Sequence, residues 1–95
     1  MTFAEITEQY LEYLKKTRTQ QYWERQEKVL RDEVLPNVGA MLLPEVYSNM
    51  MSSILNVPNL PETDQIKAHR VMNATNLVIG WAIENIPRAQ LQLYT

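Results

Sequence analysis

Six lysine and arginine side chains lie between residues 15 and 31, and they form the first group in this sequence that could do chemistry. They are Lys15, Lys16, Arg18, Arg25, Lys28 and Arg31. Only Glu24 and Glu27 oppose them, so the segment carries a charge of +4 in a 95-residue chain of net charge −2. A row of cations can neutralise phosphates and release their counterions, which gives sequence-independent affinity for DNA. The same segment also fits a solvated helix face with Glu24–Lys28 and Glu27–Arg31 pairs.

A second group is polar and lies further along the chain. Gln65, His69, Asn73 and Asn76 recur at helical spacing, with Arg70 beside them. Asn and Gln amides can pair with adenine edges in the major groove, and Arg can contact guanine or phosphate. A hydrated surface stripe explains the pattern equally well.

Among the aromatic residues, Tyr22 borders the basic segment and is the candidate for a contact with DNA. Trp81 lies between aliphatic residues and is predicted to pack in the core. The predicted DNA-binding residues are Lys16, Arg18, Gln21, Tyr22, Arg25, Lys28, Gln65, His69, Arg70 and Asn73.

Other chemistry finds little support in the sequence. With no cysteine the chain has no disulfide, no thiolate nucleophile and no sulfur ligand for zinc, and His69 is the one histidine. Asp32 and Glu33 are adjacent and point in different directions on a helix, which does not suit general acid–base work. Two glycines make no phosphate-binding loop. We therefore predict no catalytic residue, no metal ligand and no cofactor.

The composition is that of a soluble folded domain. Apolar residues make up 45% of the chain and charged residues 21%, close to globular averages. The longest uncharged apolar run, residues 71–83, is shorter than the roughly 18 residues that suggest a membrane span. No membrane segment is predicted.

The elements that must position these side chains are predicted to be helices, because Glu, Gln, Lys, Leu and Met dominate and lose little rotamer freedom in a helix. Thr2 and Glu5 have the spacing of a capping box, so a first helix should begin there. Its apolar residues recur at steps that place them on one core face: Phe3, Ile6, Tyr10, Tyr13 and Leu14.

Three further helices are expected. The second should begin at Thr17 or Thr19 and end near Leu35, with a turn over residues 36–39 because Pro36 cannot continue the hydrogen-bond ladder. The third should span residues 48–55. The fourth should run from Pro61 to about Ile86, with an apolar second half as the central buried element, where Gly80 allows close helix approach.

Together these segments predict an all-α fold, a single domain over residues 1–95 built as a four-helix bundle. The residues expected to be buried are Phe3, Tyr10, Leu30, Val34, Val78 and Trp81.

Three segments, taken in order, resemble a known family. They are residues 2–5 with the aromatic-rich helix that follows, residues 30–39 with a Leu…Val-Leu-Pro-Asn-Val-Gly pattern, and residues 81–85 with a Trp-Ala-Ile signature. This arrangement resembles the core-binding domain of phage-integrase-type tyrosine recombinases over about residues 2–86. The resemblance implies a SAM-like four-helix bundle with orthogonal helices, joined in the whole enzyme to a catalytic domain.

The resemblance also sets functional expectations. It implies a DNA-binding module that clamps a recombination half-site, with double-stranded DNA and other recombinase protomers on that DNA as partners. The family's catalytic residues belong to the catalytic domain, which we expect to be absent here, and neither His69–Arg70 nor Tyr94 has the required context. The chain alone should neither cleave nor rejoin DNA. No membrane and no small-molecule substrate is expected, and the location should be cytoplasmic and nucleoid-associated.

A different class of function remains open at this point. The sequence pI is about 5.3, which is low for a protein that clamps DNA. The alternative is a small helical protein–protein interaction module of phage or bacterial origin, which would bind its partner through apolar or acidic surface.

Overall fold

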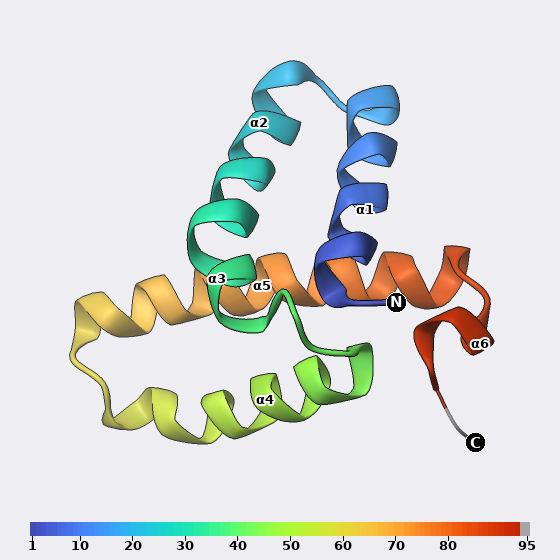
Figure 1. Ribbon diagram of the computed structural model, residues 1–95. Helices are drawn as coiled ribbons and strands as arrows, with labels where there is room; N and C mark the ends of the chain where they lie inside the picture. The colour runs from blue at the N-terminus through green and yellow to red at the C-terminus, as the bar shows by residue number, and fades with distance from the viewer. Residues whose placement is uncertain (94–95) are drawn as a thin grey trace.

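The structure, a computed structural model, describes residues 1–93, and every regular element in that range is helical. The elements are α1 (Phe3–Thr17), α2 (Gln20–Val29), η1 (Leu30–Val34), α3 (Leu35–Val38), α4 (Leu43–Asn56), η2 (Val57–Asn59), α5 (Glu62–Asn85) and α6 (Arg88–Leu91). Figure 1 shows α1 and α2 side by side, both crossing α5 steeply, while α4 runs beneath α5. The all-α prediction with orthogonal helices is confirmed.

Helix α1 begins as the sequence predicted. The Thr2 hydroxyl accepts from the Glu5 amide at 3.3 Å, and the Glu5 carboxylate accepts from the Thr2 amide at 3.3 Å. This capping box satisfies two amides that a helix N-terminus leaves without intrahelical partners. The two amides between Thr2 and Glu5 donate to the loop after α3. The Phe3 amide donates to Met41 O at 2.8 Å, and the Ala4 amide donates to Gly39 O at 2.9 Å.

The turn predicted over residues 36–39 is wrong, because the second helix continues through Pro36 to Val38. The five residues of η1 form a π-helix, in which the Leu35 amide donates to Leu30 O, five residues back. A proline ring clashes with the carbonyl of an ideal α-helical turn before it, and the wider π turn gives the ring room. The chain therefore turns at Gly39–Met41 instead.

Helix α4 is longer than the predicted third helix, since it begins at Leu43 rather than Ser48. Pro44 occupies its first turn, where an amide has no intrahelical partner and the fixed φ of proline suits the helix. The Glu45 carboxylate accepts from the Leu42 amide at 3.4 Å and helps to set the start. Pro44 thus marks a helix start that apolar spacing alone did not reveal.

Helix α5 has the predicted bounds to within one residue, but its surroundings differ from the prediction. Its second half is buried on one face only, while Leu77 and Ile83 are 38% and 51% exposed. Gly80 does not permit a close approach, because a Cβ built there meets no atom within 4 Å. Within residues 1–93, no helix has both the length and the apolar character needed to cross a membrane.

The core forms where α1, the α2–η1–α3 rod and α5 meet. Five of the six residues predicted to be buried are buried, namely Phe3, Tyr10, Leu30, Val34 and Val78. Trp81 is only half-buried, because its ring packs between the rings of Tyr10 at 5.8 Å and Tyr13 at 5.7 Å at the edge of the core. Tyr13 itself is 38% exposed, so its predicted place in the core is wrong.

Replacing Leu30 with Ala should lower the free energy of unfolding by about 2–5 kcal/mol, because Leu30 is fully buried and its loss leaves a cavity. The matched control is Leu55→Ala, which removes the same atoms from a side chain that is 78% exposed and should change stability by less than about 0.5 kcal/mol. Chemical denaturation followed by circular dichroism measures both. Equal losses in the two variants would contradict this description of the core.

The two glycines should respond in opposite directions to alanine. Gly80→Ala should stabilise the protein by up to about 1 kcal/mol, since the new methyl group meets open space in a helix interior. Gly39→Ala should destabilise it, because the added Cβ would lie 2.6 Å from Leu35 O, a backbone atom that cannot easily shift. Thermal denaturation of the two variants tests the prediction, and the same sign of change in both would refute it.

Candidate nucleic-acid interface

A groove between α2 and α5 brings together four of the predicted DNA-binding residues. Arg25 and Lys28 line it from α2, and Arg70 and Asn73 line it from α5. All four are exposed, and the groove has a volume of about 470 Å³. The packing of α2 against α5 sets this arrangement, with Ala74 buried beneath the groove. Side chains separated by more than 40 residues in the sequence therefore share one surface.

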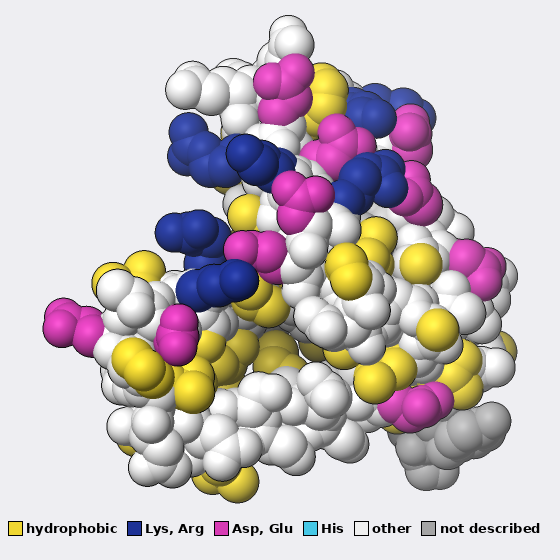
Figure 2. Space-filling view, turned by 60° about the vertical axis from the view of Figure 1, so that its left-hand side comes forward, with side chains coloured by type: hydrophobic (Ala, Val, Ile, Leu, Met, Phe, Trp, Pro, Cys, Tyr) yellow, Lys and Arg dark blue, Asp and Glu magenta, His cyan; other side chains and the backbone are white. Residues whose placement is uncertain are grey.

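Acidic residues lie near the cations of this groove but form no ion pair with them in residues 1–93. Within residues 1–93, no ion pair involves Arg25, Lys28 or Arg70. Figure 2 shows one group of Lys and Arg side chains along the left of this face and others at its upper right, beside Asp and Glu side chains. Asp32 and Glu33 also line the groove, at the end formed by η1. The groove thus offers three cations and the amides of Gln26 and Asn73 to a ligand, with acidic residues at one boundary.

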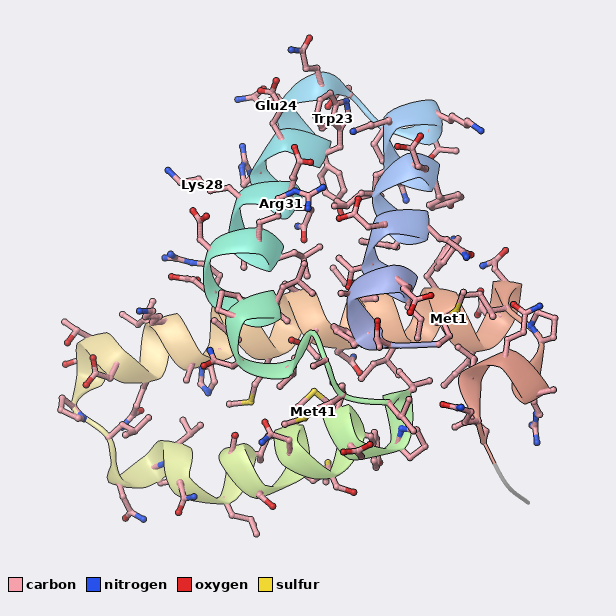
Figure 3. All side chains as sticks on the ribbon, in the orientation of Figure 1. Met1, Trp23, Glu24, Lys28, Arg31 and Met41 are labelled. Atoms are coloured by element: carbon pink, nitrogen blue, oxygen red, sulfur yellow. The ribbon has the colours of Figure 1, made fainter. Side chains whose placement is uncertain are left out.

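Arg31 has a different role from the other cations of the basic segment. Its guanidinium donates two hydrogen bonds to the Glu8 carboxylate, at 2.6 and 3.1 Å, and a third to Glu27 at 3.1 Å. In Figure 3, Arg31 lies on the side of α2 that faces α1, while Lys28 is directed away from α1. The hydrogen bonds that Arg31 donates to Glu8 and Glu27 raise the pKa of Arg31 above its ordinary value. Arg31 therefore joins α1 to α2.

Four more predicted residues lie around the other end of the α1–α2 pair, away from the groove. Lys16 and Arg18 are exposed near the end of α1, and Gln21 is exposed in the first turn of α2. The Arg18 guanidinium lies 5.7 Å from the centre of the half-buried Tyr22 ring. Lys15 makes a comparable contact with Trp23, at 5.3 Å. These residues form a second, separate group of polar and cationic side chains.

Gln65 and His69 do not line the groove. The Gln65 amide donates to Leu60 O at 2.8 Å and so holds the loop that precedes α5. His69 is exposed on α5. Of the predicted polar stripe, the structure therefore brings only Asn73, with its neighbour Arg70, to the cations of α2.

Sequence reasoning missed two features of this region. It did not find the Glu8–Arg31 pair, which joins residues 23 positions apart and leaves no local signal in the sequence. It also did not place Asp32 and Glu33 at the groove, because the π turn in η1 changes which residues share a face.

In the described part of the chain, no group of three or more His, Asp or Glu side chains could hold a metal ion. Tyr94 lies outside the described residues.

Comparison with protein families gave one match. Residues 2–46 match the phage integrase N-terminal SAM-like domain. Comparisons with curated proteins and with solved structures gave no match. The match covers α1, the α2–η1–α3 rod and the start of α4, and it supports a resemblance to the phage integrase SAM-like domain over residues 2–46, while the core-binding assignment stays a prediction.

The matched segment contains only some of the residues that line the α2–α5 groove. Arg25 and Lys28 lie within the matched SAM-like segment, whereas Arg70 and Asn73 lie beyond it on α5. The Trp-Ala-Ile signature at residues 81–83 also lies beyond it, so the resemblance there stays a prediction.

Glu8→Gln should make stability less dependent on pH in the acid range. The Arg31 hydrogen bonds hold the pKa of the Glu8 carboxyl below its ordinary value of 4.5. A lowered pKa in the folded state stabilises the protein above pH 4.5, and this contribution disappears as pH falls through the lowered value. Because both side chains are largely exposed, the loss at pH 7 should be about 0.5–1 kcal/mol.

Urea denaturation at pH 7 and at about pH 2.5 measures this effect, and the difference between Glu8→Gln and the unaltered protein should be smaller at the lower pH. Glu84→Gln is the control, since Glu84 is exposed on α5 and has no ion pair in residues 1–93. A Glu8→Gln deficit that persists unchanged at acid pH would contradict the assignment.

Proposed function

We propose that this chain is the DNA-binding module of a phage or prophage integrase, a site-specific tyrosine recombinase, and that it clamps one recombination half-site. The proposal rests on the family match over residues 2–46 together with the groove between α2 and α5. The module is non-catalytic by itself, and strand cleavage belongs to another domain of the recombinase. Other protomers on the same DNA complete the assembly.

The observation that carries the proposal is the convergence of Arg25, Lys28 and Arg70 on one groove, where none of them forms an ion pair with another described residue. Cations that are already paired, such as Arg31, gain little from a phosphate, because the new contact must replace an existing one. For an unpaired cation, the contact with a phosphate replaces no existing ion pair, and it releases the counterions of that phosphate, so it contributes fully to the affinity. The α2–α5 groove is therefore the part of the surface best suited to a DNA backbone.

The remaining predicted residues take distinct roles. Asn73 lies among the cations and is suited to read a base edge, since an amide can both donate to and accept from adenine. Lys16, Arg18, Gln21 and Tyr22 form a second contact along the same duplex. Gln65 and His69 extend the polar face of α5, although the hydrogen bond to Leu60 O reduces what Gln65 can offer a base.

Charge reversal in the groove should weaken binding to every duplex by a similar factor, because phosphate contacts carry no sequence information. If Arg25, Lys28 and Arg70 each meet a phosphate, log K should fall with log salt with a slope of about −2.7. Arg25→Glu or Lys28→Glu should reduce the magnitude of that slope by about 0.9. Fluorescence anisotropy at low salt, where screening is least, is the measurement.

Two variants complete the experiment. Arg88→Glu makes the same charge reversal on α6, at the far end of α5, and should leave affinity almost unchanged. Asn73→Ala should instead alter the preference among duplex sequences. If the chain binds no duplex at low salt, including the half-site of its own element, DNA binding is wrong and the protein-interaction alternative takes its place. An unchanged affinity in both groove reversals would also exclude the α2–α5 groove.

A further inference from the structure

A second and larger groove, of about 700 Å³, lies between the α2–η1–α3 rod, α4 and α5. Its apolar lining includes Val34, Val38 and Val46, which are themselves buried, and Met50, Val71 and Met72, which are half-buried. Figure 2 shows this hollow, with hydrophobic side chains inside it, above the lowest helix. We call it the α4–α5 groove. Nothing in the proposed DNA contact uses it.

Helix α4 forms an open wall of this groove. Of its 14 residues only Leu43 and Val46 are buried, and both lie in its first turn. Met50 is half-buried in the groove, and the adjacent Met51 and Ile54 are 44% and 42% exposed. Methionine side chains are flexible and polarisable, so surfaces rich in them adapt to apolar partners. The groove therefore presents apolar surface that the chain itself does not cover.

The rim of the α4–α5 groove is acidic. Asp32, Glu33 and Asp64 line it against the single cation Lys67, whose Nζ lies 3.9 Å from Glu33 Oε1. The other carboxylate oxygen, Glu33 Oε2, is buried and accepts no hydrogen bond from residues 1–93. A buried carboxylate oxygen without a donor costs free energy, which a cationic or N–H donor from a ligand would recover.

We propose that the α4–α5 groove binds an amphipathic, cationic helix of a partner protein. Apolar side chains of that helix, at i, i+3 or i+4 and i+7, would lie on the valine and methionine surface. A flanking Lys or Arg would donate to Glu33 Oε2. The charge of the rim decides against nucleic acid here, because three carboxylates beside one ammonium group repel phosphates.

The exposed apolar face of α4 on a second copy fits this groove poorly. Helix α4 contains neither Lys nor Arg, so it has no cation for Glu33 or Asp64. The helix that binds the α4–α5 groove therefore has a different composition from α4. The proposal is independent of DNA binding, since Arg25 and Arg70 line the other groove and take no part in this one.

The probe is a fluorescein-labelled 16-residue model helix with Leu at the i, i+3, i+4 and i+7 positions and Lys flanking them. Two matched peptides have Glu in place of Lys, or Ser in place of Leu. Anisotropy should show saturable binding of the Leu/Lys helix and at least tenfold weaker binding of the other two. Amide chemical-shift changes should map to α4 and the first half of α5.

Glu33→Gln keeps the shape of the side chain and removes its charge, so it should weaken binding of the Leu/Lys helix about tenfold without weakening binding of the Leu/Glu helix. Asp64→Asn, on an exposed rim residue, tests the same charge if Glu33→Gln does not fold. Arg88→Glu is the control, since Arg88 lines neither groove, and it should leave peptide binding unchanged.

Several results would overturn the proposal. They are failure of the Leu/Lys helix to bind, equal binding of all three peptides, unchanged affinity in both acidic variants, or shift changes confined to α1 and α2. Sedimentation equilibrium adds one more, because a dimer that the peptide dissociates would identify the occupant as a second copy of this chain.

Discussion

The start of α1 is held to the loop after α3, and the rest of the structure depends on this clasp. Backbone hydrogen bonds from Phe3 to Met41 O and from Ala4 to Gly39 O use amides that a helix N-terminus otherwise leaves unpaired. The Phe3 side chain is fully buried beneath them, so the apolar burial and the polar bonding act at the same point. Gly39 fits there because a Cβ would clash with Leu35 O. The clasp fixes where the α2–η1–α3 rod ends relative to α1, and hence where α4 begins.

How much could be predicted from the sequence depended on how local the deciding interaction is. The Thr2–Glu5 capping box involves residues within one turn, and it was predicted. Pro36 and Gly80 were misjudged, because the outcome at each depends on backbone or neighbours that the local pattern does not contain. The all-round apolar pattern of α5 likewise did not show that Leu77 and Ile83 would lack neighbours.

The candidate site shows the same difference between local interactions, which the sequence pattern contains, and long-range ones, which it does not. Counting charges along residues 15–31 identified the right segment, but only the fold separates cations that stabilise the protein from cations available to a ligand. Arg31 has three hydrogen bonds to carboxylates, whereas Arg25 and Lys28 have no acidic partner in the described residues. The participation of Arg70 and Asn73 follows from the packing of α2 on α5, which no spacing in the sequence reveals.

The π turn of η1 explains how a chain of net charge −2 can carry two grooves of opposite character. Asp32 and Glu33 lie on η1 and line both grooves, so these two carboxylates form the boundary between them. On the α2 side they face three cations, and on the α4 side they face Lys67 together with a further acid, Asp64. Low net charge therefore says little about either surface, because attraction to a ligand depends on the charges within roughly one Debye length of it. Since α5 supplies one wall of each groove, the segment beyond residue 46 is as necessary to both surfaces as the matched segment, residues 2–46.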